Sequence, residues 1–229
     1  MTVCAVLFLA AALGSRPGSG TTRSAAEQPL PPTTDLGVIE DAIAALRAQA
    51  PELAEIGSWY ATVTLHNENS GEDASFRITQ DGIVHPDDLA DLTDFFSCRR
   101  TGRHKKMNPG VLSMLVDLSE EFPGHQIQVI SGYRSRPYGV RHSKHFRGQA
   151  IDLRIAGVPL RRVRDYVWTH DHLVGVGWYP HHGFVHMDYR PGEPEAAWTA
   201  SDKSKRHRAH PRWARRARAR ALYQSNAGI

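Results

Sequence analysis

Apolar and polar positions alternate along two stretches in the first half of the chain. Trp59–Leu65 and Ala74–Ile78 both show the period of two that is typical of a half-buried β-strand. The segment between them, Asn67-Glu68-Asn69-Ser70-Gly71, is rich in residues that favour turns. Together these segments predict a β-hairpin with a longer loop.

Four other segments repeat their apolar residues every three to four positions, as an amphipathic helix does. One of them opens on Pro109, a residue favoured at the first helical position. Another begins at His85 and carries aspartates in its first turn, where they complement the helix dipole. The predicted helices cover about residues 36–47, 85–96, 109–121 and 158–170.

The second half of the chain contains four further strand candidates. In the segment 150–155 the apolar residues fall on one face and Asp152 and Arg154 on the other. The order of helices and strands predicts an α+β fold, a small antiparallel sheet with covering helices. The strand candidates are residues 126–131, 150–155, 175–179 and 184–189.

The two ends of the chain differ in composition from its middle. Residues 1–20 hold a short apolar run without the basic residues that usually precede one, and they predict an incomplete signal peptide. Residues 21–57 are predicted to be a linker with a short helix. The folded domain is expected over about residues 58–200, and residues 201–229 form a basic tail. That run is too short to span a bilayer, and no other apolar run is long enough to predict a transmembrane helix.

The charge of the chain is concentrated in that tail. The formal net charge is +4, yet the tail alone holds nine Lys or Arg against one acid, so residues 1–200 are net acidic. A polybasic run attracts polyanions, and envelope polyanions are the expected partners. A helix is compatible with the segment after Pro211, and charge on all its faces argues against packing into a core. No nucleic-acid-reading motif accompanies the tail, so specific nucleic-acid binding is not expected.

Three residues of the domain are candidates for a metal site. His145 lies in a polar loop, Asp152 in an apolar strand and His186 in the last strand candidate. A carboxylate among apolar neighbours needs a partner, because an unpaired buried charge is costly. Two imidazoles and one carboxylate are a common catalytic zinc set that leaves a fourth position for water. The two cysteines, Cys4 and Cys98, exclude a Cys-rich zinc finger.

The neighbourhood of these residues resembles a known family. Residues 143–152, SKHFRGQAID, match S-x-H-x-x-G-x-A-x-D, the signature of D-alanyl-D-alanine carboxypeptidase and VanX-type zinc peptidases. The segments 131–135 (SGYRS), 175–179 (GVGWY) and 184–188 (FVHMD) are similar to those of the YcbK/MepK-type murein endopeptidases. The stretch 65–72, LHNENSGE, is similar to the strand and turn that open that branch, with Ser70 in place of a threonine.

The resemblance implies a hedgehog/D-Ala-D-Ala-peptidase-like zinc fold and an exported or periplasmic zinc metallopeptidase. It implies one Zn²⁺ per chain, with His145, Asp152 and His186 as ligands. Arg134 would face the substrate, where a guanidinium can hold a carboxylate or stabilise an oxyanion. The expected substrate is a peptidoglycan stem peptide or cross-link with D-centres.

The general base stays open at this point. The carboxypeptidase and VanX enzymes carry a Glu shortly before the last histidine, and this chain has none there. Asp188 shares a strand face with His186, so it could accept the proton of the attacking water or orient a ligand histidine. His142, His181 and His182 are alternative acid–base groups. Because the glutamate is missing, a non-catalytic zinc module that binds peptidoglycan or a protein is the alternative function.

Overall fold

The computed structural model describes residues 59–138, 140–201, 204–209 and 211–227. The expected signal segment 1–20 and the expected linker and helix 21–57 lie outside these residues, and they stay predictions. Among the described residues, no helix combines the length and apolarity that crossing a bilayer needs.

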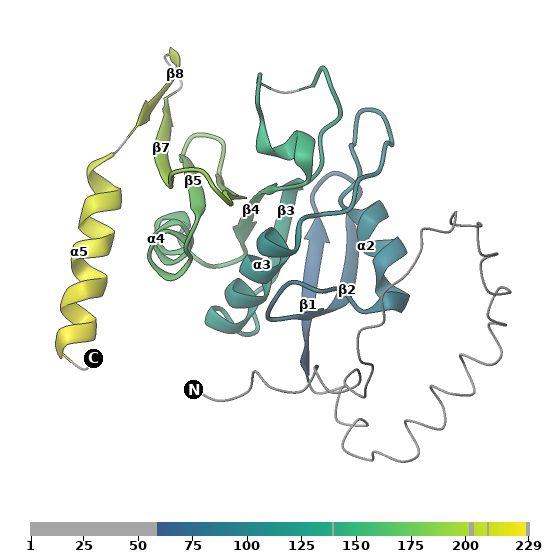
Figure 1. Cartoon of the computed structure of the whole chain (residues 1–229), viewed down its shortest axis with the longest axis horizontal. Coiled ribbons are helices and arrows are strands. Elements are labelled where there is room, and N and C mark those ends of the chain that lie inside the picture. Colours follow the sequence, from purple (N-terminus) through teal and green to yellow (C-terminus); the bar gives the residue numbers. More distant parts are fainter. Residues whose placement is uncertain (1–58, 139, 202–203, 210, 228–229) are drawn as a thin grey trace, which may run out of the picture. The chain divides into compact units, whose positions relative to one another are not determined.

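A single mixed sheet of eight strands organises the described part of the chain (Figure 1). Its spatial order is β2-β1-β3-β4-β6-β5-β7-β8. The pairs β1–β3 and β5–β7 are parallel and the other neighbours are antiparallel. The strands are β1 (Tyr60–Asn67), β2 (Glu72–Thr79), β3 (Ile127–Ser131), β4 (Ala150–Ile155), β5 (Val174–Tyr179), β6 (Phe184–Tyr189), β7 (Ala196–Ser201) and β8 (Ser204–Ala209).

The sheet corrects the prediction of a small antiparallel one. The strands expected from periodicity are present, but β7 and β8 extend the sheet beyond them. The sequence of β8, SKRHRA, is charged and lacks the apolar alternation that identifies a half-buried strand. The sheet includes it through backbone pairing with β7, and β7 joins by parallel pairing with β5, which no local pattern reveals.

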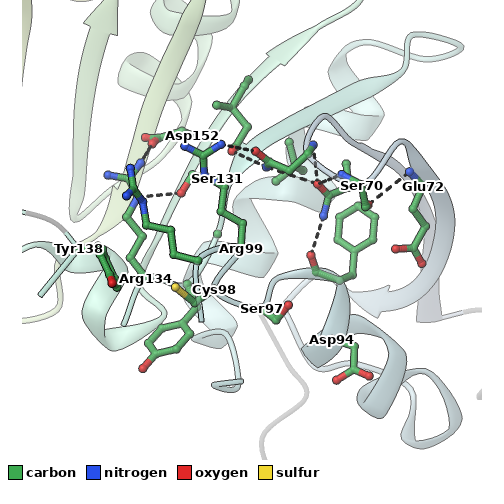
Figure 2. A pocket seen from close by; sticks show the side chains of 18 of the residues that line it. Ser70, Glu72, Asp94, Ser97, Cys98, Arg99, Ser131, Arg134, Tyr138 and Asp152 are labelled. Carbon is green, nitrogen blue, oxygen red and sulfur yellow. Dashed lines mark hydrogen bonds and ion pairs between the residues drawn. The ribbon is translucent and has the colours of Figure 1, made fainter. Parts of the chain in front are cut away.

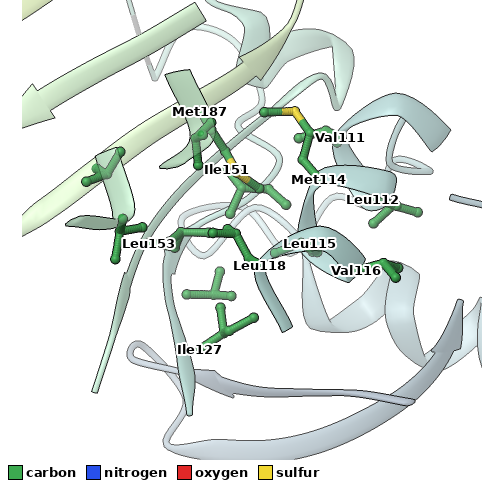
Figure 3. Close-up of a cluster of buried hydrophobic side chains, with 14 of the residues drawn as sticks. Val111, Leu112, Met114, Leu115, Val116, Leu118, Ile127, Ile151, Leu153 and Met187 are labelled. Carbon is green, nitrogen blue, oxygen red and sulfur yellow. The ribbon is translucent and has the colours of Figure 1, made fainter. Parts of the chain in front are cut away.

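Two helices cover one face of the sheet, and the main core lies between them and the strands. Helix α3 (Pro109–Glu121) packs against β1 and β2, and α4 (Leu160–His170) packs against β5 and β6. The apolar face of α3 meets Ile127, Ile151, Leu153 and Met187 from three strands (Figure 3). The short helices are η2 (Pro86–Asp88), α2 (Leu89–Phe95) and η3 (Lys144–Arg147).

The alternation along β4, β5 and β6 gives the other face of the sheet a different character. Ile151, Val176 and Met187 point toward the helices, so their neighbours along each strand point away from them. Those neighbours are the glycines of β5 and the polar residues of β4 and β6. The polar residues of β4 and β6 therefore lie together on the sheet face opposite α3 and α4.

The basic tail is part of the folded unit, against the expectation that its charge would keep it off the core. Helix α5 (Arg212–Ala227) lies beside α4 and buries Ala214 and Ala217. Trp168 of α4 donates its indole N–H to the carbonyl of Ala214 at 3.0 Å, and the guanidinium of Arg218 lies 4.0 Å from the Trp168 ring. The small alanines allow close helix approach, and the arginines around them cover aromatic rings instead of repelling the core.

Candidate functional site

Two adjacent strands place the first two candidate ligands side by side. Asp152 of β4 and His186 of β6 are directly paired in the antiparallel register, so both side chains project from the same face. His145 comes from η3, whose last turn ends at Gly148 in the left-handed region with φ of 65°. A Cβ at Gly148 would lie 2.6 Å from the Lys106 carbonyl oxygen, so the loop that carries His145 needs glycine there.

The three side chains converge on one point. His145 Nε2 lies 3.2 Å from His186 Nδ1, and Asp152 Oδ1 lies 3.3 Å from the first nitrogen and 2.7 Å from the second. All three residues are buried, and among the described residues they form the group of His, Cys, Asp or Glu side chains that could hold a metal ion.

The spacing of these atoms fits a tetrahedral metal ion. Metal–ligand bonds of about 2.0–2.1 Å place neighbouring ligands of a tetrahedron about 3.3 Å apart, close to the observed separations. Two imidazole nitrogens and one carboxylate oxygen are also the donor types that zinc accepts. Three protein donors leave one position for water or substrate.

Hydrogen bonds on the outer side of each imidazole determine which nitrogen is available. Nδ1 of His145 lies 2.7 Å from the carbonyl oxygen of Gly132, so it carries the proton and Nε2 keeps its lone pair. Nε2 of His186 lies 3.0 Å from Oδ2 of Asp188, which leaves Nδ1 of His186 for the centre. Both rings are thus oriented in the way that metal-ligating histidines usually are.

Asp188 belongs to this outer layer. It is fully buried, and its other oxygen, Oδ1, lies 2.7 Å from Nε of Arg190. Burial would raise the pKa of Asp188, but His186 and Arg190 outweigh it and keep the pKa below its ordinary value. The carboxylate therefore faces the ring nitrogen of His186 that points away from the convergent atoms.

The glycines of β5 make room for this arrangement. Gly175 is paired with Asp188, and a Cβ there would lie 2.3 Å from Oδ2 of Asp188 and from Nε of Arg190. Gly177 is paired with His186, and a Cβ there would lie 2.5 Å from the ring of Trp198. The Trp198 ring in turn lies 5.2 Å from that of His186. The segment GVGWY thus has a packing reason for both glycines.

The three converging residues combine one carboxylate with two imidazoles, and their contacts set the protonation of each. Burial would raise the pKa of Asp152, but the two histidines hold it far below its ordinary value, so the carboxylate stays ionised. Burial would lower the pKa of His186, yet hydrogen bonds to Asp152 and Asp188 raise it to about 9. Burial lowers the pKa of His145, which stays neutral and able to act as a ligand.

Arg134 lies at the edge of the site and faces open space. Its Nη2 donates to Oδ2 of Asp152, and its Nε donates to the Ser131 hydroxyl at 2.8 Å. Its side chain is 34% exposed, in contrast to the fully enclosed ligands. Arg134 and Asp152 together line one part of a groove of about 760 Å³ that runs to the β1–β2 turn (Figure 2).

The remaining candidates lie elsewhere. His142, His181 and His182 are exposed loop residues outside the converging group. Tyr133 and Tyr138 line the groove, whereas Trp168 is a core residue. The thiol of Cys98 is buried and free, and accepts a hydrogen bond from Ser135 at 3.4 Å.

Sequence reasoning missed Arg190, Trp198 and the carbonyl of Gly132 as supports of the site. The only sequence feature that could have identified them is the position of Arg190 and Gly132 within or next to the matched motifs.

Comparisons with known proteins point in one direction. Residues 58–193 match a family model described as peptidoglycan L,D-endopeptidase MepK. The chain is 33% identical over 140 residues to peptidoglycan L,D-endopeptidase MepK of Escherichia coli K12, covering 56% of this chain and 76% of that protein. It is 33% identical over 141 residues to the probable peptidoglycan L,D-endopeptidase MepK of Haemophilus influenzae, covering 56% and 75%.

Proposed function

The chain belongs to the MepK family of peptidoglycan endopeptidases, and from this membership we propose that it hydrolyses peptide cross-links of peptidoglycan with a zinc ion held by His145, Asp152 and His186. The observation that carries the proposal is the convergence of these three donors, one of which, Asp152, lines the groove. The names of the relatives give the L,D-type peptide bond as the bond to test first.

The three donors suit one zinc ion in a site open to substrate. A zinc ion held by these donors would supply Lewis acidity and would lower the pKa of a bound water to about 7. The chain's own contribution is to keep Asp152 ionised and His145 neutral and to direct Nδ1 of His186 inward, where a metal ion would displace its proton.

We assign Arg134 to the substrate side of the centre. One of its N–H groups fixes Oδ2 of Asp152 and another bonds to Ser131, which leaves further donors of the five in a guanidinium. These donors face the groove at the same end as the metal-binding atoms. They are placed to stabilise negative charge that develops on the carbonyl oxygen during attack.

We assign Asp188 to the orientation of His186 rather than to proton transfer. Its Oδ2 is engaged by the outer nitrogen of His186 and also accepts from Arg190 at 3.1 Å. A general base must reach the water that it deprotonates, within about 3 Å or through one bridging water. A fully buried carboxylate behind the imidazole ring does not meet that requirement.

Two further expectations follow from the family. We propose that the protein acts on the peptidoglycan of the cell envelope and that its architecture is the hedgehog/D-Ala-D-Ala-peptidase type. The envelope polyanions expected at the basic tail have no support in the comparisons. Two of the tail's arginines are engaged within the chain, Arg218 with Glu195 at 2.5 Å and Arg220 with Asp165 at 2.6 Å.

Digestion of purified sacculi tests the function directly. Zinc-loaded protein is expected to convert cross-linked muropeptide dimers to monomers, resolved by mass, and a chelator is expected to stop the conversion. Asp152→Asn removes the ligand charge and is expected to lower the rate about a thousandfold or more. Asp91→Asn, at an exposed position of α2, is the matched control and is expected to act like wild type. One bound zinc with no change in the muropeptides would favour the non-catalytic binding module instead.

A further inference from the structure

The groove beside the metal-binding residues has a basic wall. Arg99 and Arg100 line it, together with Arg134 near the convergent donors. Arg134 is paired with Asp152, so its charge is balanced within the chain. In Figure 2, Arg99 lies between Asp152 and Arg134 on one side and Ser70 and Glu72 on the other.

Arg99 is held in place by a neutral group. Its Nη1 donates to Oδ1 of Asn69 at 3.0 Å, and Asn69 in turn donates to the carbonyl oxygen of Ile130 at 2.9 Å. Asn67 fixes the same turn by donating to the carbonyl oxygen of Phe95 at 2.9 Å. The guanidinium is therefore oriented by a turn that is tied to β3 and to α2, and the tie does not neutralise its charge.

The acids of the groove do not balance Arg99. Asp152 bonds to Arg134, and Asp94 lies 2.8 Å from Nδ1 of His104. Glu72 lines the groove, but it forms no ion pair with Arg99 within the described part of the chain. Arg100 stacks over the ring of Tyr138 at 5.1 Å, also without a carboxylate partner among the described residues. An oriented but unneutralised guanidinium in a groove is suited to bind an anion.

We propose that Arg99 binds a free carboxylate of the peptidoglycan stem peptide, at a subsite separate from the scissile bond. The proposal rests on the proposed function, because the substrate class comes from it. Stem peptides combine amide bonds with free carboxylates, and a planar guanidinium can bind a carboxylate through two parallel N–H···O bonds. Only one of the five N–H donors of Arg99 has a partner among the described residues, so two parallel N–H donors remain available for a carboxylate.

A binding experiment separates this subsite from catalysis. The affinity of zinc-free protein for a soluble stem peptide is measured by calorimetry, with the free carboxylates intact and with each amidated in turn. The variants are Arg99→Gln, Arg99→Lys and, as matched control, Arg103→Gln, an exposed arginine of the same loop that does not line the groove. Arg99→Gln is expected to weaken binding about 10- to 100-fold, since a charged hydrogen-bonded pair is lost.

The decisive result is a coupling between residue and substrate group. Amidation of one carboxylate should weaken wild-type binding by a similar factor and leave binding by Arg99→Gln unchanged. Arg99→Lys should recover part of the affinity, because it keeps the positive charge but lacks the two parallel N–H donors of a guanidinium. Equal weakening of both peptide forms by Arg99→Gln, or no peptide binding by wild type, would overturn the proposal. Peptide binding without cleavage by zinc-loaded protein would contradict the proposed function and leave the subsite standing.

Discussion

Two pairs of aspartates, one buried and one partly buried, behave in opposite ways in this molecule. Asp152 and Asp188 of β4 and β6 keep pKa values below the ordinary range of a carboxyl group. Asp117 of α3 and Asp171 at the end of α4 have raised values, and Asp171 reaches about 7. Burial pushes all four values upward, so burial does not explain the difference.

The difference lies in the positive charge around each pair. Asp152 contacts His145, His186 and Arg134, and Asp188 contacts His186 and Arg190. Asp117 has His170 at 3.9 Å, and the charge of Asp117 raises the pKa of Asp171 further. One pair is arranged to attract a metal ion, and the other shares a proton. Shielding of a carboxylate from water is therefore not by itself a sign of a metal site.

Removing one imidazole ligand should have the largest effect on metal binding at Asp152. His145→Ala removes one of the three metal-binding donors, and zinc content is expected to fall well below one per chain. Activity on muropeptides is expected to fall about a thousandfold or more. The matched control is His142→Ala, which removes an exposed histidine three residues earlier and should retain both zinc and activity. Full zinc occupancy in His145→Ala, measured by mass spectrometry, would contradict the ligand assignment.

Asp188→Asn distinguishes a metal ligand from the residue that orients it. Loss of the carboxylate that orients His186 should reduce zinc affinity and activity about 10- to 100-fold. Because the role is orientation, excess zinc should restore most of the activity. A base would behave differently: the variant would bind zinc normally, and added zinc would not restore the rate. Zinc titration with parallel rate measurements distinguishes the two outcomes.

Gly175→Ala tests the same support from the neighbouring strand. The new Cβ would lie 2.3 Å from the Asp188 carboxylate and should displace it from His186. We expect zinc affinity to fall about tenfold, at the low end of such supporting effects. Val176→Ala, the next residue, points to the helices and should lower the stability by about 1–3 kcal/mol without changing zinc affinity. If both variants only lowered stability, the glycine would have no role in the site.

Asp171→Asn addresses the proton-sharing pair, where the smallest effect on function is expected. The folded state holds a proton on Asp171 up to about pH 7, whereas the unfolded chain loses it near 3.8. Stability from this group is therefore present at low pH and is lost as the pH rises from about 4 to 7. The variant should be more stable than wild type at pH 8 by about 1–2 kcal/mol and similar at pH 4. Urea unfolding at the two pH values measures this, and activity should not change.

The hairpin, the helices α2, α3 and α4, and the central strands could be predicted because each carries its own periodic pattern. The extent of the sheet could not, since β8 is charged and depends on pairing with a segment that is itself hard to recognise. The packing of α5 was predicted wrongly. Charge on every face describes its arginines, but Ala214 and Ala217 form a narrow stripe small enough to approach α4. Composition averaged over a helix hides such a stripe.

For the site, the sequence by itself determined the residue types, their order and the strand face that His186 and Asp188 share. A period of two fixes that face within one strand without any knowledge of neighbouring strands. The tertiary structure decided which ring nitrogens point inward, that Asp188 lies behind His186, and that Arg134 bonds to a candidate ligand. Those features depend on the register between β4 and β6 and on the loop that brings in His145. Such long-range placement is set by the packing of the whole domain and leaves no local pattern.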